Sequence, residues 1–208
     1  MAAREARIYA GLSDAMNLWL RLIWLFVTSR FRPRLELPGD ASELTLRVLL
    51  NDLDISLHMN NGRYLAIMDL GRLDLLLRSP LGRAVWQHGW TPVASAVLIR
   101  FRRELRSFAR YRLETRVVAW GADSVLIAQT FVFADGAHKG QTAARALVKG
   151  GLYDRKARRY VPMAELMRLV GVSGDSPPPS AETEAFLAAD GAMREASRTR
   201  SPDSDENF

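Results

Sequence analysis

The feature that most limits the fold is an apolar segment with helical spacing that follows directly on an acidic loop. Apolar side chains recur at three- and four-residue intervals from Tyr64 to Leu77, which predicts one long buried helix. Asn60 or Asn61 would cap its start, because an asparagine side chain accepts hydrogen bonds from the free amides of the first turn. Gly71 inside the helix predicts a close approach to another element, since a glycine there otherwise only weakens the helix. The rest of the chain must be organised around this helix.

Strand-forming segments flank the helix on both sides. One is predicted before it, over residues 44–50, and four after it, over 92–103, 111–120, 124–134 and 142–154. Turn residues at 121–123 and 135–136 separate the later strands, and short helices are predicted at 81–88 and 162–170. One strand, one buried helix and an antiparallel meander indicate the α+β class, although several α+β sheets share this order.

The acidic loop is a candidate reaction centre. The strand should end near Asp52, because aspartate, serine and asparagine favour turns and local hydrogen bonds. The first helical turn then presents unpaired amides and the positive end of the helix dipole to the loop. A carbonyl group held between Asp54 and this helix start would be polarised on its oxygen and open to attack from the carboxylate side. The stretch therefore predicts an acyl-transfer site.

The loop also carries a recognisable string of residues. The string is Asp52-x-Asp54-x-x-x-His58-x-Asn60-Asn61-x-x-Tyr64, followed by Asp69 and Arg72. It resembles the corresponding segment of hotdog-fold acyl-CoA thioesterases of the 4-hydroxybenzoyl-CoA thioesterase-like superfamily. The resemblance is strongest to a subgroup that also has a Trp/Leu-rich N-terminal segment. The resemblance covers about residues 43–165. It implies a hotdog fold, a long central helix wrapped by an antiparallel β-sheet.

The resemblance also implies a function. Asp54 would act as general base or nucleophile on an acyl-CoA or acyl-carrier-protein thioester, and the amide near Asn61 would stabilise the oxyanion. It further implies a hydrolase of lipid metabolism without a resident cofactor, working as a homodimer or homotetramer with its acyl site at the subunit interface. Two alternatives stay open, a hotdog hydratase or dehydratase and a non-catalytic acyl-binding or membrane-associated protein.

Other residues near the motif have two interpretations each. His58 would orient water or substrate, or only hold the loop, and it is kept as a catalytic candidate. Asn60, Gly62 and Tyr64 are candidates for substrate binding. Asn60 would also cap the helix, and Tyr64 would also pack in the core. Asp69 and Arg72 are spaced for an ion pair on the helix.

A basic run, IRFRRELRSFARYR, begins within the strand predicted at 92–103. Arg100 and Arg102 share one face of an extended strand, which is either solvated or binds the phosphates of coenzyme A. A nucleic-acid surface is not predicted, because the aromatic residues form no exposed stacking series. Apolar residues would line an acyl tunnel or simply fill the core: Val93, Ala96, Val97, Leu98 and Phe131.

Composition limits the remaining chemistry. The chain has no cysteine, which is consistent with a reducing, cytoplasmic location, and its three histidines are too far apart in sequence to predict a metal site. Residues 173–208 hold eight acids and three arginines, a net charge of −5, which leaves +11 for the rest of a chain of net charge +6. This tail, rich in proline and serine, is predicted to be largely disordered, apart from a helix near 181–196.

The N-terminal segment, residues 1–35, stands outside the predicted domain at 40–170. Residues 17–27 (NLWLRLIWLFV) are apolar but too few to span a bilayer, which takes about 20. Arginines rather than a cleavage site follow, so a signal peptide is not predicted. Residues 17–34 would either lie in the membrane interface, on the inner face of the membrane, or pack on the domain or its dimer mate.

Overall fold

The computed structural model describes residues 18–172 and 175–200, and its central feature is one antiparallel sheet. The strands are ordered β1-β3-β4-β5-β2, and the short β6 pairs with the end of β5. Their bounds are β1 Ser42–Arg47, β2 Thr91–Phe101, β3 Arg110–Trp120, β4 Val125–Phe133, β5 Thr142–Asp154 and β6 Arg159–Tyr160. The four long strands after the helix, β2 to β5, lie within one or two residues of their predicted ranges, and the two-residue β6 was not predicted.

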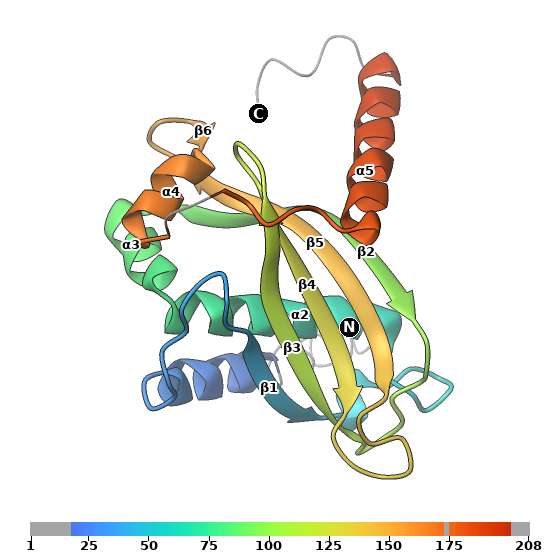
Figure 1. Cartoon of the computed structure of the whole chain (residues 1–208). Helices are drawn as coiled ribbons and strands as arrows, with labels where there is room; N and C mark the ends of the chain where they lie inside the picture. Colours follow the sequence, from blue (N-terminus) through green and yellow to red (C-terminus); the bar gives the residue numbers. More distant parts are fainter. Residues whose placement is uncertain (1–17, 173–174, 201–208) are drawn as a thin grey trace, which may run out of the picture.

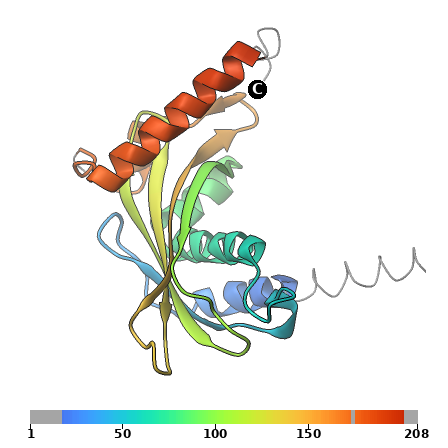
Figure 2. The same cartoon turned by 90° about the vertical axis from the view of Figure 1, so that its right-hand side faces the viewer.

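Helix α2 (Asn61–Arg78) lies across the concave side of the curled sheet (Figures 1 and 2). Its Tyr64, Ile67 and Met68 are buried in the main core against strands β3 to β5. A β-carbon on Gly71 would lie 2.5 Å from the Thr115 hydroxyl oxygen, so the glycine is what lets the helix approach the sheet this closely. A long helix wrapped by an antiparallel sheet is the predicted hotdog arrangement.

Shorter helices close the two ends of the sheet. They are the 3-10 turn η1 (Leu50–Asp52), α3 (Pro80–His88) and α4 (Met163–Leu169). The first strand differs from its predicted range of 44–50, since β1 ends at Arg47 and η1 follows. The cause is Asp52, whose carboxylate accepts a hydrogen bond from the Leu49 amide at 2.9 Å and bends the chain into a turn.

The N-terminal segment is helical over residues 18–29 and packs on the domain. Leu25 is fully buried in the main core, and Leu18 and Leu22 pack against it. One face of this helix therefore packs on the domain, while residues 1–17 lie outside the described part of the chain. Within the described residues, no helix is both long and apolar enough to cross a membrane.

The C-terminal tail differs from the largely disordered segment that its composition predicted. Helix α5 (Ala181–Arg200) is longer than the expected helix and lies on the outer face of the sheet (Figure 2). Phe186 is buried in a cluster with residues of β3, β4 and β5, and ion pairs join Arg145 to Glu182 and Lys149 to Asp190, each at 2.7 Å. The composition of this acidic segment did not show that it would pair with basic residues on the outer face of β5.

Candidate active site

The loop between η1 and α2 forms a tight turn that presents Asp54 and His58 together. The Asp54 amide donates to the His58 carbonyl at 2.9 Å, and a β-bridge between Leu53 and Met59 closes the turn at its base. Asp54 Oδ1 also accepts a hydrogen bond from the Ser56 amide at 2.8 Å. Such local bonds are what aspartate and serine favour in turns, so the sequence itself holds the carboxylate in place.

The carboxylate of Asp54 lies beside an imidazole and is open to solvent. His58 Nδ1 is 3.2 Å from Asp54 Oδ2, and the Asp54 side chain is 23% exposed. On the other side of the ring, His58 Nε2 is 3.9 Å from Glu104 Oε2. Arg106 hydrogen-bonds Glu104 and keeps the pKa of that carboxyl below its usual value. His58 thus lies between two carboxylates, and one of them is the predicted catalytic group.

The start of α2 follows directly on this loop. Asn60 is its N-cap, and the side-chain oxygen accepts a hydrogen bond from the Gly62 amide at 2.8 Å. The Gly62 amide is therefore engaged by the cap. The Asn61 amide has no acceptor among the described residues, and as the first residue of an 18-residue helix it lies at the positive end of the dipole. Asn61 is the helix-start amide that the motif predicted as oxyanion donor.

Asp52, the first aspartate of the motif, is structural. It is 2% exposed and accepts a hydrogen bond from Arg21 of the N-terminal helix at 2.6 Å. Its backbone carbonyl accepts from the Asn60 amide at 2.8 Å. Asp52 therefore links the N-terminal helix to the start of α2 across the Asp54 loop.

Tyr64 has the core role that its position predicted. Its ring packs edge-on against Phe101 and Phe131, with centroids 5.0 and 4.9 Å away. Burial raises the pKa of Tyr64 to about 12, and the Leu105 backbone is its hydrogen-bond partner. This hydroxyl therefore stays protonated at neutral pH.

Arg100 and Arg102 lie at the end of β2 and are exposed. Arg100 is paired in register with Arg145 of β5, and the Arg102 amide donates to the Ala143 carbonyl at 2.8 Å. Within residues 18–172 and 175–200, neither guanidinium forms an ion pair with an acid. Phe101, between them, contacts Tyr64 in the first turn of α2, so this basic strand end lies at the same end of α2 as Asp54.

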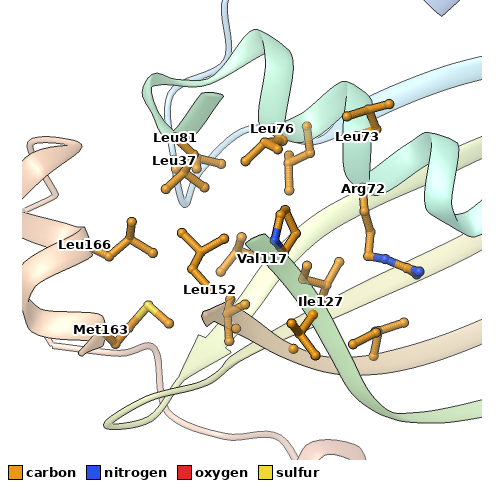
Figure 3. Close-up of a pocket in the computed structure, with 18 of the residues that line it drawn as sticks. Leu37, Arg72, Leu73, Leu76, Leu81, Val117, Ile127, Leu152, Met163 and Leu166 are labelled. Atoms are coloured by element: carbon orange, nitrogen blue, oxygen red, sulfur yellow. The ribbon is translucent and has the colours of Figure 1, made fainter. Parts of the chain in front are cut away.

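An apolar cavity of about 220 Å³ lies at the other end of α2 (Figure 3). Its wall comes from the second half of α2, the start of β2, the middle of the sheet and α4, and Asp69 and Arg72 are its charged residues. Because a helix rises about 1.5 Å per residue, the cavity residues Asp69 to Leu76 lie about 12–22 Å along α2 from its start. Asp69 and Arg72 form the predicted ion pair.

The residues suggested for an acyl tunnel divide between three places. Val93 lines the cavity, and Phe131 is fully buried in the main core. Val97 and Leu98, on the edge strand β2, are 42% and 49% exposed, and Ala96 is half-buried beside them. They do not form one continuous channel within a single chain.

A family model described as the thioesterase-like superfamily matches residues 48–170, which is more than half of the chain. The chain belongs to this superfamily. The match includes the Asp54 loop, α2 and strands β2 to β6, while β1 lies just before it. Membership agrees with the resemblance that the motif carried.

The chain is also similar to individual proteins. Protein THEM6 of Xenopus laevis is 38% identical over 85 residues, and Protein THEM6 of Danio rerio is 41% identical over 86 residues. Each alignment covers 41% of this chain, and the chain spans only 41% and 43% of those two relatives. The crystal structure of YbaW, a probable thioesterase from Escherichia coli, matches with a TM-score of 0.57 and 22% identity over 62% of this chain and 95% of that chain. This structural likeness shows the hotdog fold.

Sequence reasoning missed two residues that the structure brings to the loop. Glu104 contacts His58 from the loop after β2, and its only sequence signal was being the single acid in a basic run. Arg21 reaches Asp52 from a helix that the sequence placed outside the domain. Among the described residues, no cluster of three or more potential ligands could hold a metal ion.

Proposed function

We propose that this protein hydrolyses acyl thioesters of coenzyme A or of an acyl carrier protein. The observation that carries the proposal is the position of Asp54, a solvent-accessible carboxylate held beside His58 in the turn that leads into the Asn61 amide of α2. A hydrolase of this type needs a group that activates the nucleophile and a donor that stabilises the oxyanion. The loop and the helix start supply both within a few residues.

In this mechanism the thioester carbonyl oxygen is bound by the Asn61 amide. Asp54 removes a proton from water, and the hydroxide adds to the carbonyl carbon. The tetrahedral intermediate then collapses with cleavage of the C–S bond, and the leaving thiolate takes up the proton from Asp54. The products are a carboxylic acid and the free thiol. In the nucleophilic version, the Asp54 carboxylate adds to the carbonyl carbon and the C–S bond breaks, so the thiol leaves and an acyl anhydride remains, which water then hydrolyses. His58 keeps the Asp54 carboxylate oriented in either version.

Arg100 and Arg102 are suited to bind the phosphates of coenzyme A. They are exposed, lie at the same end of α2 as Asp54 and have no acidic partner in the described part of the chain. A guanidinium binds phosphate oxygens through paired hydrogen bonds. We therefore expect that changing both arginines raises KM for acyl-CoA much more than it lowers kcat.

The edge strand β2 supports a homodimer. It is a sheet edge of 11 residues with exposed apolar side chains, which a second copy would cover by antiparallel pairing. Such pairing sets the start of β2 in one copy beside the end of β2 in the other. The apolar cavity of one copy would then lie near the Asp54 loop of the other and receive its acyl chain. Leu98→Lys tests this, because a charge at the edge should convert a dimer to a monomer in analytical ultracentrifugation.

The decisive experiment measures thiol release from acetyl-, hexanoyl-, palmitoyl- and benzoyl-CoA by the full chain and by Asp54→Asn. Loss of a positioned base should lower kcat by about 100-fold or more. Asp123→Asn, the same change in an exposed turn at the far end of the sheet, is the matched control and should keep full activity. Full activity in a folded Asp54→Asn protein would remove this assignment. Acyl-CoA binding without turnover by the unaltered chain would instead indicate an acyl-binding protein.

A further inference from the structure

The helix at residues 18–29 has two different faces. One face is buried and carries Leu25, Arg21 and Ser29, at 1%, 9% and 6% exposure. The opposite face and the residues just after it are exposed and apolar. We call this set the outer apolar face, and it consists of Trp19, Leu20, Ile23, Trp24, Phe26, Val27 and Phe31.

The outer apolar face is unusually large for a soluble surface. Six of its members lie within three turns of one helix and are 45–63% exposed, and Phe31 is 85% exposed. Since a buried aromatic side chain removes about 150–250 Å² from water, the exposed part of this set is on the order of several hundred Å². Contiguous patches of this size mark interaction surfaces rather than ordinary solvent-facing positions.

The folded domain holds this face in a fixed orientation. At one end of the helix, Arg21 donates to Asp52 at 2.6 Å and to the Arg47 carbonyl at 3.2 Å. Beyond the other end, Arg32 pairs with the buried Asp74 at 2.8 Å, and Arg78 donates to the Pro33 carbonyl at 2.9 Å. The helix is therefore part of the domain, and its apolar face is displayed outward without any need for the helix to detach.

The charge around the face selects its partner. No acidic residue occurs between residues 18 and 32, and the charged side chains there are Arg21, Arg30 and Arg32. Arg30 and Arg34 are exposed at the end of the helix where Phe31 lies. Tryptophans beside arginines suit the boundary of an anionic bilayer, where the rings enter the headgroup layer and the cations meet lipid phosphates. A second copy of the same face would instead place arginine opposite arginine.

The catalytic loop lies beside this helix. Figure 2 shows the helix at 18–29 next to the segment that leads into α2, and the Arg21 to Asp52 contact joins them. Ile55 and Leu57, in the turn after Asp54, are 101% and 69% exposed. Apolar groups are therefore exposed on both the helix and the catalytic turn.

We propose that the outer apolar face, with Arg30 and Arg34 at its edge, docks the protein on an anionic lipid surface. The protein then binds peripherally, with the helix lying along the headgroup layer and the catalytic loop close to the lipid. This proposal is independent of whether Asp54 hydrolyses thioesters.

The test is flotation of the full chain with vesicles of phosphatidylcholine alone or with added phosphatidylglycerol. The double variant Trp19→Gln/Ile23→Gln removes two outer side chains one helical turn apart. Trp86→Gln is the matched control, because Trp86 is 87% exposed on α3, away from this helix. Circular dichroism and thermal melting check that each variant is folded.

The unaltered chain and Trp86→Gln are expected to float with the anionic vesicles, and the double variant at least tenfold less. Added salt should weaken this binding. Absence of vesicle binding by the unaltered chain, equal binding by the double variant, or equal binding to uncharged vesicles would each overturn the proposal. A dimer-to-monomer change in the double variant, without vesicle binding by the unaltered chain, would assign the face to self-association instead. Thioesterase activity is measured separately, so its absence would not be mistaken for a failure to dock.

Discussion

Replacing Gly71 by alanine should destabilise the protein although alanine is the better helix former. In an exposed helix this change stabilises by about 1 kcal/mol. Here the added β-carbon would lie 2.5 Å from Thr115 Oγ1, 2.8 Å from Leu113 Cδ2 and 2.9 Å from Gln129 Nε2. All three neighbours are fully buried, so none can move into solvent.

The cost has two parts. Inserting a methyl group into a packed core costs about 1–3 kcal/mol. The Gln129 side chain donates to the Met68 carbonyl at 2.9 Å and to Thr115 at 3.0 Å, and displacing it from such buried bonds costs about 1–3 kcal/mol. After subtracting the helix gain of about 1 kcal/mol, we expect a net loss of about 1–5 kcal/mol in the free energy of unfolding.

Urea unfolding and thermal melts followed by circular dichroism measure this loss. For a chain of this size, about 3 kcal/mol corresponds to a Tm lowered by roughly 6–12 °C. Gly191→Ala is the matched control, because Gly191 lies inside α5 and a β-carbon there meets nothing within 4 Å. The Gly191→Ala protein should have the same free energy of unfolding as the unaltered chain or a slightly higher one. A Gly71→Ala protein as stable as the unaltered chain would refute the close packing of α2 on the sheet.

Three further predictions concern charged and titrating groups. Asp74 is fully buried and forms ion pairs with Arg78 and Arg32, so Asp74→Ala should lower the free energy of unfolding by about 3–5 kcal/mol. A loss below about 1 kcal/mol in urea unfolding would contradict this. The raised pKa of Tyr64, about 12, means that its contribution to stability is complete below pH 10 and lost as the pH rises toward 12. Tyr64→Phe should therefore flatten the fall in Tm above pH 10, and an unchanged slope would argue against its burial. The hydrogen bond with Arg145 lowers the pKa of Glu182. The stabilisation that this ion pair gives to α5 is therefore complete above the usual glutamate pKa and is lost as the pH falls through the lowered pKa. Proteolysis of α5 should increase at low pH in the unaltered chain but change less with pH in Glu182→Gln, and equal pH profiles would exclude this pair as the cause.

The predicted elements agree well with the structure because their signals are local. Helical spacing from Tyr64 to Leu77 placed α2, and the turn residues after Trp120 and Phe133 separated the strands to within one or two residues. The Asp54 turn was also readable, since aspartate, serine and asparagine form their hydrogen bonds within a few residues. These features depend on side chains that are neighbours in the sequence.

The predictions that failed or were missing depend on residues far apart in the chain. The α5 segment has an acidic, disorder-like composition, and it becomes part of the fold through contacts with the sheet, namely the buried Phe186 and the ion pairs with Arg145 and Lys149 of β5. Glu104 meets His58 because β2 and α2 bring their ends together, which no spacing in the sequence encodes.

The sequence by itself therefore determined the central helix, the strand order along the chain and the acidic loop at the helix start, because short-range hydrogen bonding and periodicity define them. Only the tertiary structure decided what meets that loop and what the N-terminal helix exposes. Arg21 and Asp52 are 31 residues apart, and they pair because the helix buries Leu25 in the core. Because Leu25 is buried, the opposite face of the helix is exposed. The helix is apolar on nearly every face, so the periodicity of its sequence does not predict which face is buried.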